Sequence, residues 1–256
     1  MNLQNSLRLT VLLPAVILTG CAYSTTLSPP TDSRNIHFSA TVPADLESLP
    51  LSAMYRSEKC TRNRTSGSGK SYEVPGFNSA KYPLSITATG DVSADIPVNG
   101  GGYCDWKLSN IVFEVKLRDP AKIEPLISKN HGEEATFVFD NHAPATFDGG
   151  YEKQTGDVNE ELILFPLITE SFIGGHEKSF WLIGKYETLT YKVKNVKNIN
   201  LTIDYKSDMK THRIGIKKKE ENAMATFIYP DGEQEKTREL FPEYKKLMKM
   251  YNDRKK

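Results

Sequence analysis

The sequence predicts a mostly β protein, with an antiparallel, sandwich-like body of one or two β lobes and an amphipathic helix at its C-terminal end. Hydrophobic and polar residues alternate in many short stretches of the 256-residue chain, which is typical of half-buried strands. Turn residues separate these stretches, and a helical pattern occurs only near the end of the chain. Many short strands divided by turns favour two packed sheets.

The first expected strands lie before residue 118. Ile36, Phe38, Ala40 and Val42 alternate with polar residues, and the same pattern occurs at 84–88 and 92–96. The sequence Thr89-Gly90-Asp91 between the last two stretches predicts a hairpin turn. A longer strand is expected at 106–117, where alternate residues are apolar up to Asp119-Pro120.

The second half of the chain continues the pattern and ends in the helix. Further strands are expected at 135–139, 162–167, 180–183, 189–193, 199–205, 212–217 and 223–229. If there are two lobes, the best boundary is 119–130, which gives an N-terminal lobe at 35–118 and a C-terminal lobe at 119–256. Tyr244, Leu247, Met248 and Tyr251 fall at helical spacing, with lysines on the other face.

Residues 1–20 have the features of a signal peptide. Arg8 is followed by the apolar stretch 9–18, and small residues precede Cys21. The apolar stretch is about ten residues long, whereas a helix needs about twenty to cross a bilayer. Pro14 also disfavours a stable spanning helix. We therefore expect residues 1–20 to be removed on export.

The motif Leu18-Thr19-Gly20-Cys21 resembles the lipobox of bacterial lipoproteins. The resemblance implies that Cys21 carries lipid and becomes the new N-terminus. Ala22, rather than Asp, implies the outer membrane, with the body facing the periplasm. The alternatives are an ordinary signal peptide, or an uncleaved anchor, with Cys21 incidental. On this interpretation the chain meets the membrane only through its lipid anchor.

Residues 21–34 are expected to form a lipidated tether. Ser, Thr and Pro dominate 22–34, and no hydrophobic periodicity is present. Such a stretch predicts a free coil, about 43 Å long when fully extended. We therefore expect the folded body to stand away from the membrane.

Cys60 and Cys104 are the two cysteines that remain when Cys21 is lipidated. An oxidising compartment favours a disulfide between them. Two free buried thiols are the alternative. A metal site is less favoured, because the close cysteine pairs of zinc sites are missing.

No pattern in the sequence predicts catalysis, a metal or a cofactor. The chain has 33 basic and 32 acidic side chains, which gives no electrostatic reason to expect nucleic acid. Residues 66–71 (SGSGKS) lack the first glycine of a phosphate-binding loop, since Arg64 stands there. The five histidines are scattered, and neither H-E-x-x-H nor G-x-S-x-G occurs. We expect the protein not to be an enzyme.

Loops that combine glycine with an aromatic residue predict a recognition surface. They occur at 99–103, 147–151 and 172–176, and they nominate Tyr103, Tyr151 and Phe172 as partner-binding residues. Glycine permits close backbone approach, and aromatic rings give rigid contact area. Arg62 and Arg64 are further candidates, for an acidic partner. The alternative is that these loops are hairpin ends packed on the core and that the basic loop is only solvated.

A second resemblance suggests a function. The stretch from Met54-Tyr55-Arg56-Ser57 to Cys60 and the stretch Tyr103-Cys104-Asp105-Trp106 look like immunity lipoproteins that neutralise lipase effectors of type VI secretion. The resemblance implies binding to a phospholipase delivered into the periplasm. The alternatives are a structural or assembly lipoprotein of the envelope or of a secretion system, and a carbohydrate- or lipid-handling enzyme.

Overall fold

The computed structural model describes residues 24–142, 151–185 and 189–255. The expected signal peptide (residues 1–20), Cys21 and the loop residues 147–150 lie outside the described residues. Within them, the expectation of a mostly β body with a C-terminal helix is confirmed. No helix of the described part is both long and apolar enough to cross a membrane.

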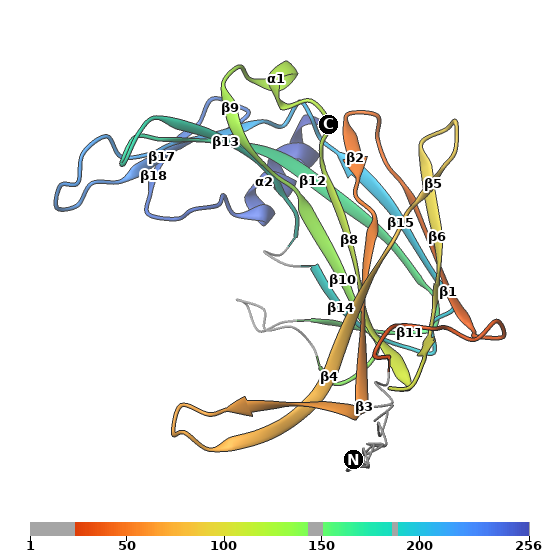
Figure 1. The fold of residues 1–256 in the computed structure, drawn as a ribbon. Coiled ribbons are helices and arrows are strands. Elements are labelled where there is room, and N and C mark those ends of the chain that lie inside the picture. Colours follow the sequence, from red (N-terminus) through yellow and green to blue (C-terminus); the bar gives the residue numbers. More distant parts are fainter. Residues whose placement is uncertain (1–23, 143–150, 186–188, 256) are drawn as a thin grey trace, which may run out of the picture.

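The first sheet forms one layer of the body (Figure 1). Its strands in spatial order are β18 (Gln234–Thr237), β17 (Ala225–Ile228), β16 (Thr211–Ile214), β12 (Val158–Ser171), β15 (Asn198–Tyr205), β1 (Asn35–Thr41), β6 (Asp91–Pro97) and β5 (Ser85–Ile86). β13 (Glu177–Ile183) pairs with β12, and β9 (Ile127–His131) pairs with β13. The predicted turn joins β5 to β6, with Gly90 at a φ of 89°.

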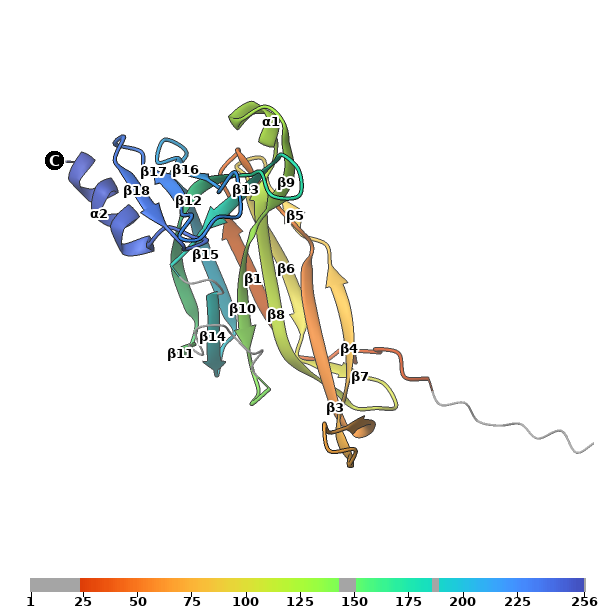
Figure 2. The ribbon, with the colours of Figure 1, turned by 90° about the vertical axis from the view of Figure 1, so that its left-hand side faces the viewer.

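The second sheet packs against the first. Its order is β11 (Glu152–Thr155), β14 (Leu189–Lys194), β10 (Glu133–Val138), β8 (Trp106–Leu117), β3 (Leu51–Thr65) and β4 (Ser71–Tyr82). β2 (Leu46–Ser48) and β7 (Asn99–Gly101) are short strands that pair with β8. The strands run along the long axis of the molecule, with the β3–β4 hairpin at one end and α2 (Tyr244–Arg254) at the other (Figure 2).

Both sheets contain parallel pairs, so they are mixed rather than purely antiparallel. β1 pairs in parallel with β15, and β15 pairs in parallel with β12. In the second sheet β10 pairs in parallel with β14. Period-two alternation indicates which face of a strand is buried, but not the direction of its neighbour. The direction was therefore beyond what the pattern could predict.

Residues 35–118 and 119–256 both contribute strands to both sheets. β1 lies beside β15, and β8 lies beside β10. The boundary near Asp119 falls between β8 and the one-turn helix α1 (Pro120–Ile123). It divides the chain without dividing the sheets.

The main core lies between the two sheets. Alternate residues of β1 and β8 point into it, and the rings of Phe38 and Phe113 meet there at 4.8 Å between centroids. A second cluster lies under α2, where Leu247 packs with Phe165 and Phe227. Because β12 passes between the two clusters, it is buried on both faces, which explains its continuous apolar run.

The N-terminal segment 24–34 corrects the expectation of a free tether. The carbonyl of Thr25 accepts hydrogen bonds from Trp106 Nε1 at 3.0 Å and from Asn78 Nδ2 at 2.9 Å. The Ser28 amide donates to the Gly100 carbonyl at 2.9 Å, and Leu27 packs on the core. This segment is ordered by hydrogen bonds to its backbone and by the packing of one apolar side chain. Neither produces a hydrophobic periodicity in the sequence. The segment is docked on the body.

Candidate functional site

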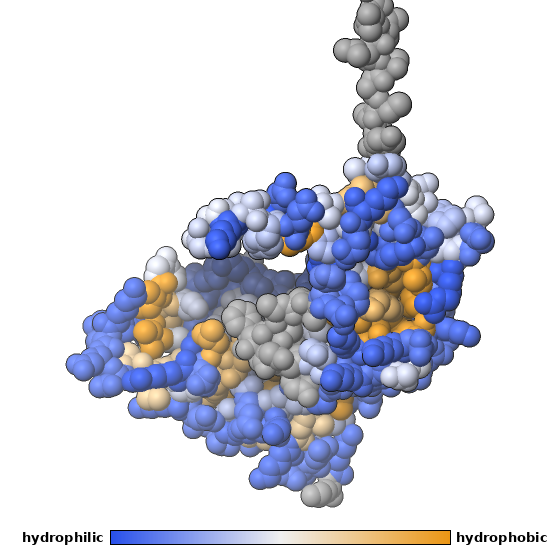
Figure 3. All heavy atoms as spheres, turned by 90° about the horizontal axis from the view of Figure 1, so that it is seen from below, coloured by the Kyte–Doolittle hydropathy of each residue, from blue (hydrophilic) through white to orange (hydrophobic). Residues whose placement is uncertain are grey.

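The β3–β4 hairpin extends beyond the sheet to which it belongs. Up to Arg56, β3 pairs with β4 on one side and with β8 on the other. From Thr61 to Thr65 it pairs with β4 alone, which carries the ribbon about 16 Å further. We call residues 58–75 the arm. In Figure 3 the arm stands off from the rest of the body, and the surface between them is hollowed.

The arm is fixed at its root by the predicted disulfide. Cys60 and Cys104 are bonded, with their Cα atoms 5.4 Å apart. An isolated two-stranded ribbon is at best marginally stable in water, so an arm outside the sheet needs such a brace. We call the group Lys59, Cys60, Tyr103 and Cys104 the arm root.

Ser57 organises the backbone at the arm root. The pairing of β3 with β4 jumps from Ser57↔Gly76 to Thr61↔Pro75, so three residues of β3 bulge out. The buried Ser57 hydroxyl donates to the Cys104 carbonyl at 2.5 Å. It also accepts the amides of Lys59 at 3.1 Å and Cys60 at 2.8 Å. One hydroxyl thus satisfies two amides that the bulge removes from the ladder and ties the bulge to the turn that contains Cys104.

Gly76 permits the close crossing of the two strands at the bulge. A Cβ atom at this position would lie 1.9 Å from the Cys60 carbonyl oxygen, a distance that no side chain tolerates. Glycine is therefore required by the proximity of the Cys60 backbone. This residue and Ser57 escaped the sequence analysis. The spacing of Ser57 two and three residues before the amides it accepts is the signal that could have found it.

Cations on the arm and its root rest on aromatic rings. The Arg62 guanidinium lies 3.9 Å from the centroid of Phe77 and donates to the Phe77 carbonyl at 2.9 Å. The Lys59 ammonium lies 3.9 Å from the centroid of Tyr103. Each such contact at an exposed site is worth about 0.5–1 kcal/mol. These contacts restrict the cations while leaving them exposed.

Arg64 and Tyr72 are directly opposite each other near the arm's tip. Arg64 is exposed, and half of the Tyr72 surface is exposed. Because paired residues project from the same face of a ribbon, Arg62 and its opposite residue Val74 share this face. The arm therefore presents a face with two arginines and a tyrosine.

A pocket of about 430 Å³ lies beside the arm root. Arg56 and Asp140 line it, with their Nε and Oδ2 atoms 4.0 Å apart, and His142 Nδ1 lies 3.3 Å from the same carboxylate. Ser109 beneath them is fully buried, and its hydroxyl accepts a hydrogen bond from Arg56. The polar groups of the pocket are thus paired with one another rather than aimed at a ligand.

The structure brings some of the candidate residues together and separates others. Arg62, Arg64 and Tyr103 belong to the arm and its root. Tyr151 precedes β11, which is four strand positions from β3 in the same sheet, or about 19 Å. Phe172 follows β12 in the other sheet and stacks on His176 at 5.2 Å. The candidates therefore do not form a single patch.

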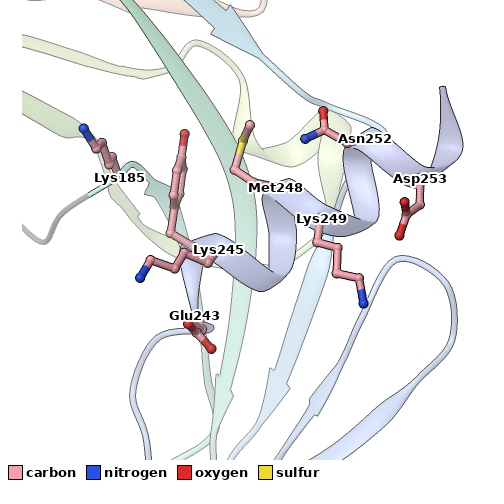
Figure 4. Close-up of a pocket in the computed structure, with 8 residues that line it drawn as sticks. Lys185, Glu243, Lys245, Met248, Lys249, Asn252 and Asp253 are labelled. Carbon is pink, nitrogen blue, oxygen red and sulfur yellow. The ribbon is translucent and has the colours of Figure 1, made fainter.

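A cavity of about 730 Å³ lies along α2, and none of the five candidate residues lines it (Figure 4). Met248 and Tyr244 form its apolar side, and Lys185 stands at its rim. Burial raises the pKa of the Tyr244 hydroxyl, which donates to the Ile163 carbonyl at 3.3 Å. Lys185 Nζ donates to Glu152 Oε1 at 2.6 Å. Both polar groups are thus engaged within the protein.

In the described ranges, no group of three or more His, Cys, Asp or Glu side chains is placed to hold a metal ion. Comparison with family models, with curated proteins and with solved structures found no match for this chain. The candidate site is therefore argued from its own geometry.

Proposed function

We propose that this chain is an outer-membrane lipoprotein, facing the periplasm, that binds a protein partner through the outer part of the arm, residues 61–75. One observation carries the proposal: a two-stranded ribbon is held outside its sheet by a disulfide and presents Arg62, Arg64 and Tyr72 to solvent. A hairpin that packs on no core adds little to stability. Its residues are therefore available for recognition.

The residue types on the arm support a protein partner. Arginine and tyrosine are enriched among the residues that dominate binding energy in protein interfaces. The disulfide and the stacking of Arg62 on Phe77 limit the freedom that binding would otherwise remove. Such preorganisation lowers the entropic cost of association. The proposed contact residues are thus suited to tight binding.

The charge of the arm favours an acidic partner surface. The arm carries four basic residues and two acidic ones, all exposed: Lys59, Arg62, Arg64 and Lys70 against Glu58 and Glu73. Complementary charge at an interface speeds association and selects among partners. We infer that the partner presents carboxylates to the arm.

The resemblance of residues 54–60 and 103–106 to immunity lipoproteins suggests that this partner is a phospholipase toxin delivered by type VI secretion. Binding would block access to the toxin's active site, and protection would depend on a slow off-rate. No acid, base or nucleophile of the chain takes part in this mechanism.

Deleting the gene tests the proposal. We expect the deletion strain to become sensitive to sibling cells that deliver the lipase encoded beside this gene. We also expect the five histidines, changed singly to glutamine, to leave protection nearly intact, because the proposed mechanism uses none of them. His37, His142 and His176 are exposed, where substitutions cost under about 0.5 kcal/mol; His131 and His212 are partly buried, so their variants must first show an unchanged melting temperature. A fully resistant deletion strain would contradict the immunity function and favour a role in envelope or secretion-system assembly.

A further inference from the structure

The docked N-terminal segment fixes the distance between the lipid anchor and the body. Thr25 is held by Trp106 and Asn78, and Ser28 is held by Gly100. The Thr26 carbonyl oxygen lies 2.6 Å from the place of a Cβ atom at Gly102, so the segment runs against the 101–105 loop. The chain is therefore attached to the body from Thr25 onward.

Three residues lie between Cys21 and Thr25, so the two positions are joined by four Cα–Cα steps. They reach about 14 Å at full extension. The headgroup layer on each side of a bilayer is about 5–7 Å thick. At full extension, a lipid on Cys21 thus leaves about 7–9 Å between the headgroup layer and Thr25.

The surface beside Thr25 carries side chains that suit the headgroup region. Tyr103 is 42% exposed, and tyrosine is enriched at membrane–water interfaces. Lys59 lies over the Tyr103 ring and is exposed, so its ammonium is available to lipid phosphates. Glu58 and Asp105 are exposed nearby. Lys107 is exposed beside Asp105, with its Nζ atom 2.7 Å from Oδ1, so two cations and two anions balance here. The short tether, rather than net charge, therefore brings this surface to the membrane.

We propose that the 101–105 loop and the arm root lie on the lipid surface, with Tyr103 in the headgroup layer and Lys59 among the phosphates. This inference rests on the lipid anchor at Cys21 in the proposed function. It places the arm at the level where a phospholipase meets its substrate. The docked segment then serves to position the body as well as to attach it.

Tryptophan substitution gives a direct test. Tyr103→Trp is compared with Tyr151→Trp, which is matched in exposure, at 41%, and lies at the opposite edge of the sheet. The lipidated proteins are placed in phosphatidylethanolamine and phosphatidylglycerol vesicles that contain a headgroup-labelled quencher lipid. The native Trp106 and Trp181 give both variants the same background. We expect Tyr103→Trp to lose most of its added emission and Tyr151→Trp to keep it.

A variant with a longer tether provides the second part of the test. Ten Gly and Ser residues inserted between Ala22 and Tyr23 should restore the emission of Tyr103→Trp. Equal quenching of the two tryptophan variants in acylated protein would overturn the membrane contact and leave the anchor standing. A mass spectrum without acyl chains, or a Cys21→Ser variant that stays on the vesicles as wild type does, would overturn the anchor and this inference together.

Discussion

At the residue scale, the arm depends on one glycine and one serine that carry no functional chemistry. Ser57 binds the backbone of the bulge, and Gly76 allows the Cys60 carbonyl to approach. The disulfide joins β3 to the turn that contains Cys104 and does not define how β3 and β4 cross. Cys60 and Cys104 were predictable from their number and compartment, whereas the contact of Gly76 with Cys60 arises only from the folded crossing.

Gly76→Ala should therefore destabilise the protein. The added methyl group would overlap the Cys60 carbonyl, and forced overlaps in packed regions cost about 1–3 kcal/mol. Gly67→Ala, at the tip of the arm, is the matched control because a Cβ atom there meets nothing within 4 Å. Urea denaturation measures both. Equal stability of the two variants would show that the strands do not cross as described.

Glu133 is a second residue whose environment in the fold affects the stability of the protein. It is 9% exposed, and its Oε1 atom has no hydrogen-bond partner among the described residues. Burial first, and the neighbouring Glu134 second, raise the pKa of Glu133 well above its ordinary value. The folded state therefore keeps a proton that the unfolded state releases. The contribution of Glu133 to stability is therefore greatest below about pH 4.5 and is lost as pH rises through its folded-state pKa.

Glu133→Gln should consequently raise the melting temperature at pH 7.5 and leave it nearly unchanged at pH 4, because the amide never ionises. Thermal unfolding at the two pH values measures the difference. Glu134→Gln, on the exposed side of the same strand, should give a smaller gain. A Glu133→Gln variant that is less stable than wild type at pH 7.5 would contradict this interpretation.

At the element scale, the strands that line the core between the sheets were largely predictable from the sequence, whereas the arm was not. Residues 106–117 alternate because one face is buried, and the structure has β8 there. From Thr61 to Thr65 the arm covers no core, so its sequence carries no apolar alternation to detect. The docked segment 24–34 was missed for the related reason that backbone hydrogen bonds order it.

The disulfide should stabilise the arm more than any other element. In the Cys60→Ser/Cys104→Ser variant we expect a lower melting temperature, with a loss of up to about 4 kcal/mol by the chain-entropy model. Hydrogen exchange should accelerate most in residues 61–75, which pair with no third strand. Uniform acceleration across both sheets, or none, would contradict a brace that acts on the arm.

At the scale of the whole molecule, two sheets share a core, an arm extends from one end and α2 covers a second cluster at the other. Thr25, four positions after the proposed anchor, and the arm root lie at the same end, where the docked segment meets Trp106 and Asn78. Sequence analysis nominated Tyr103, Arg62 and Arg64 as partner-binding residues; all three are exposed, and their role stays a prediction. Chain order could not indicate that Phe172 lies in the other sheet.

The central claim is that the arm binds an acidic protein partner, and the affinity of the purified protein for the lipase effector of the proposed function tests it most directly. Arg62→Glu/Arg64→Glu should weaken binding by about 2 kcal/mol or more, which is about 30-fold in Kd. Lys218→Glu/Lys219→Glu makes the same change of charge at exposed positions between β16 and β17 and should leave Kd unchanged. No binding by the wild-type protein, or equal loss in the two double variants, would contradict the claim.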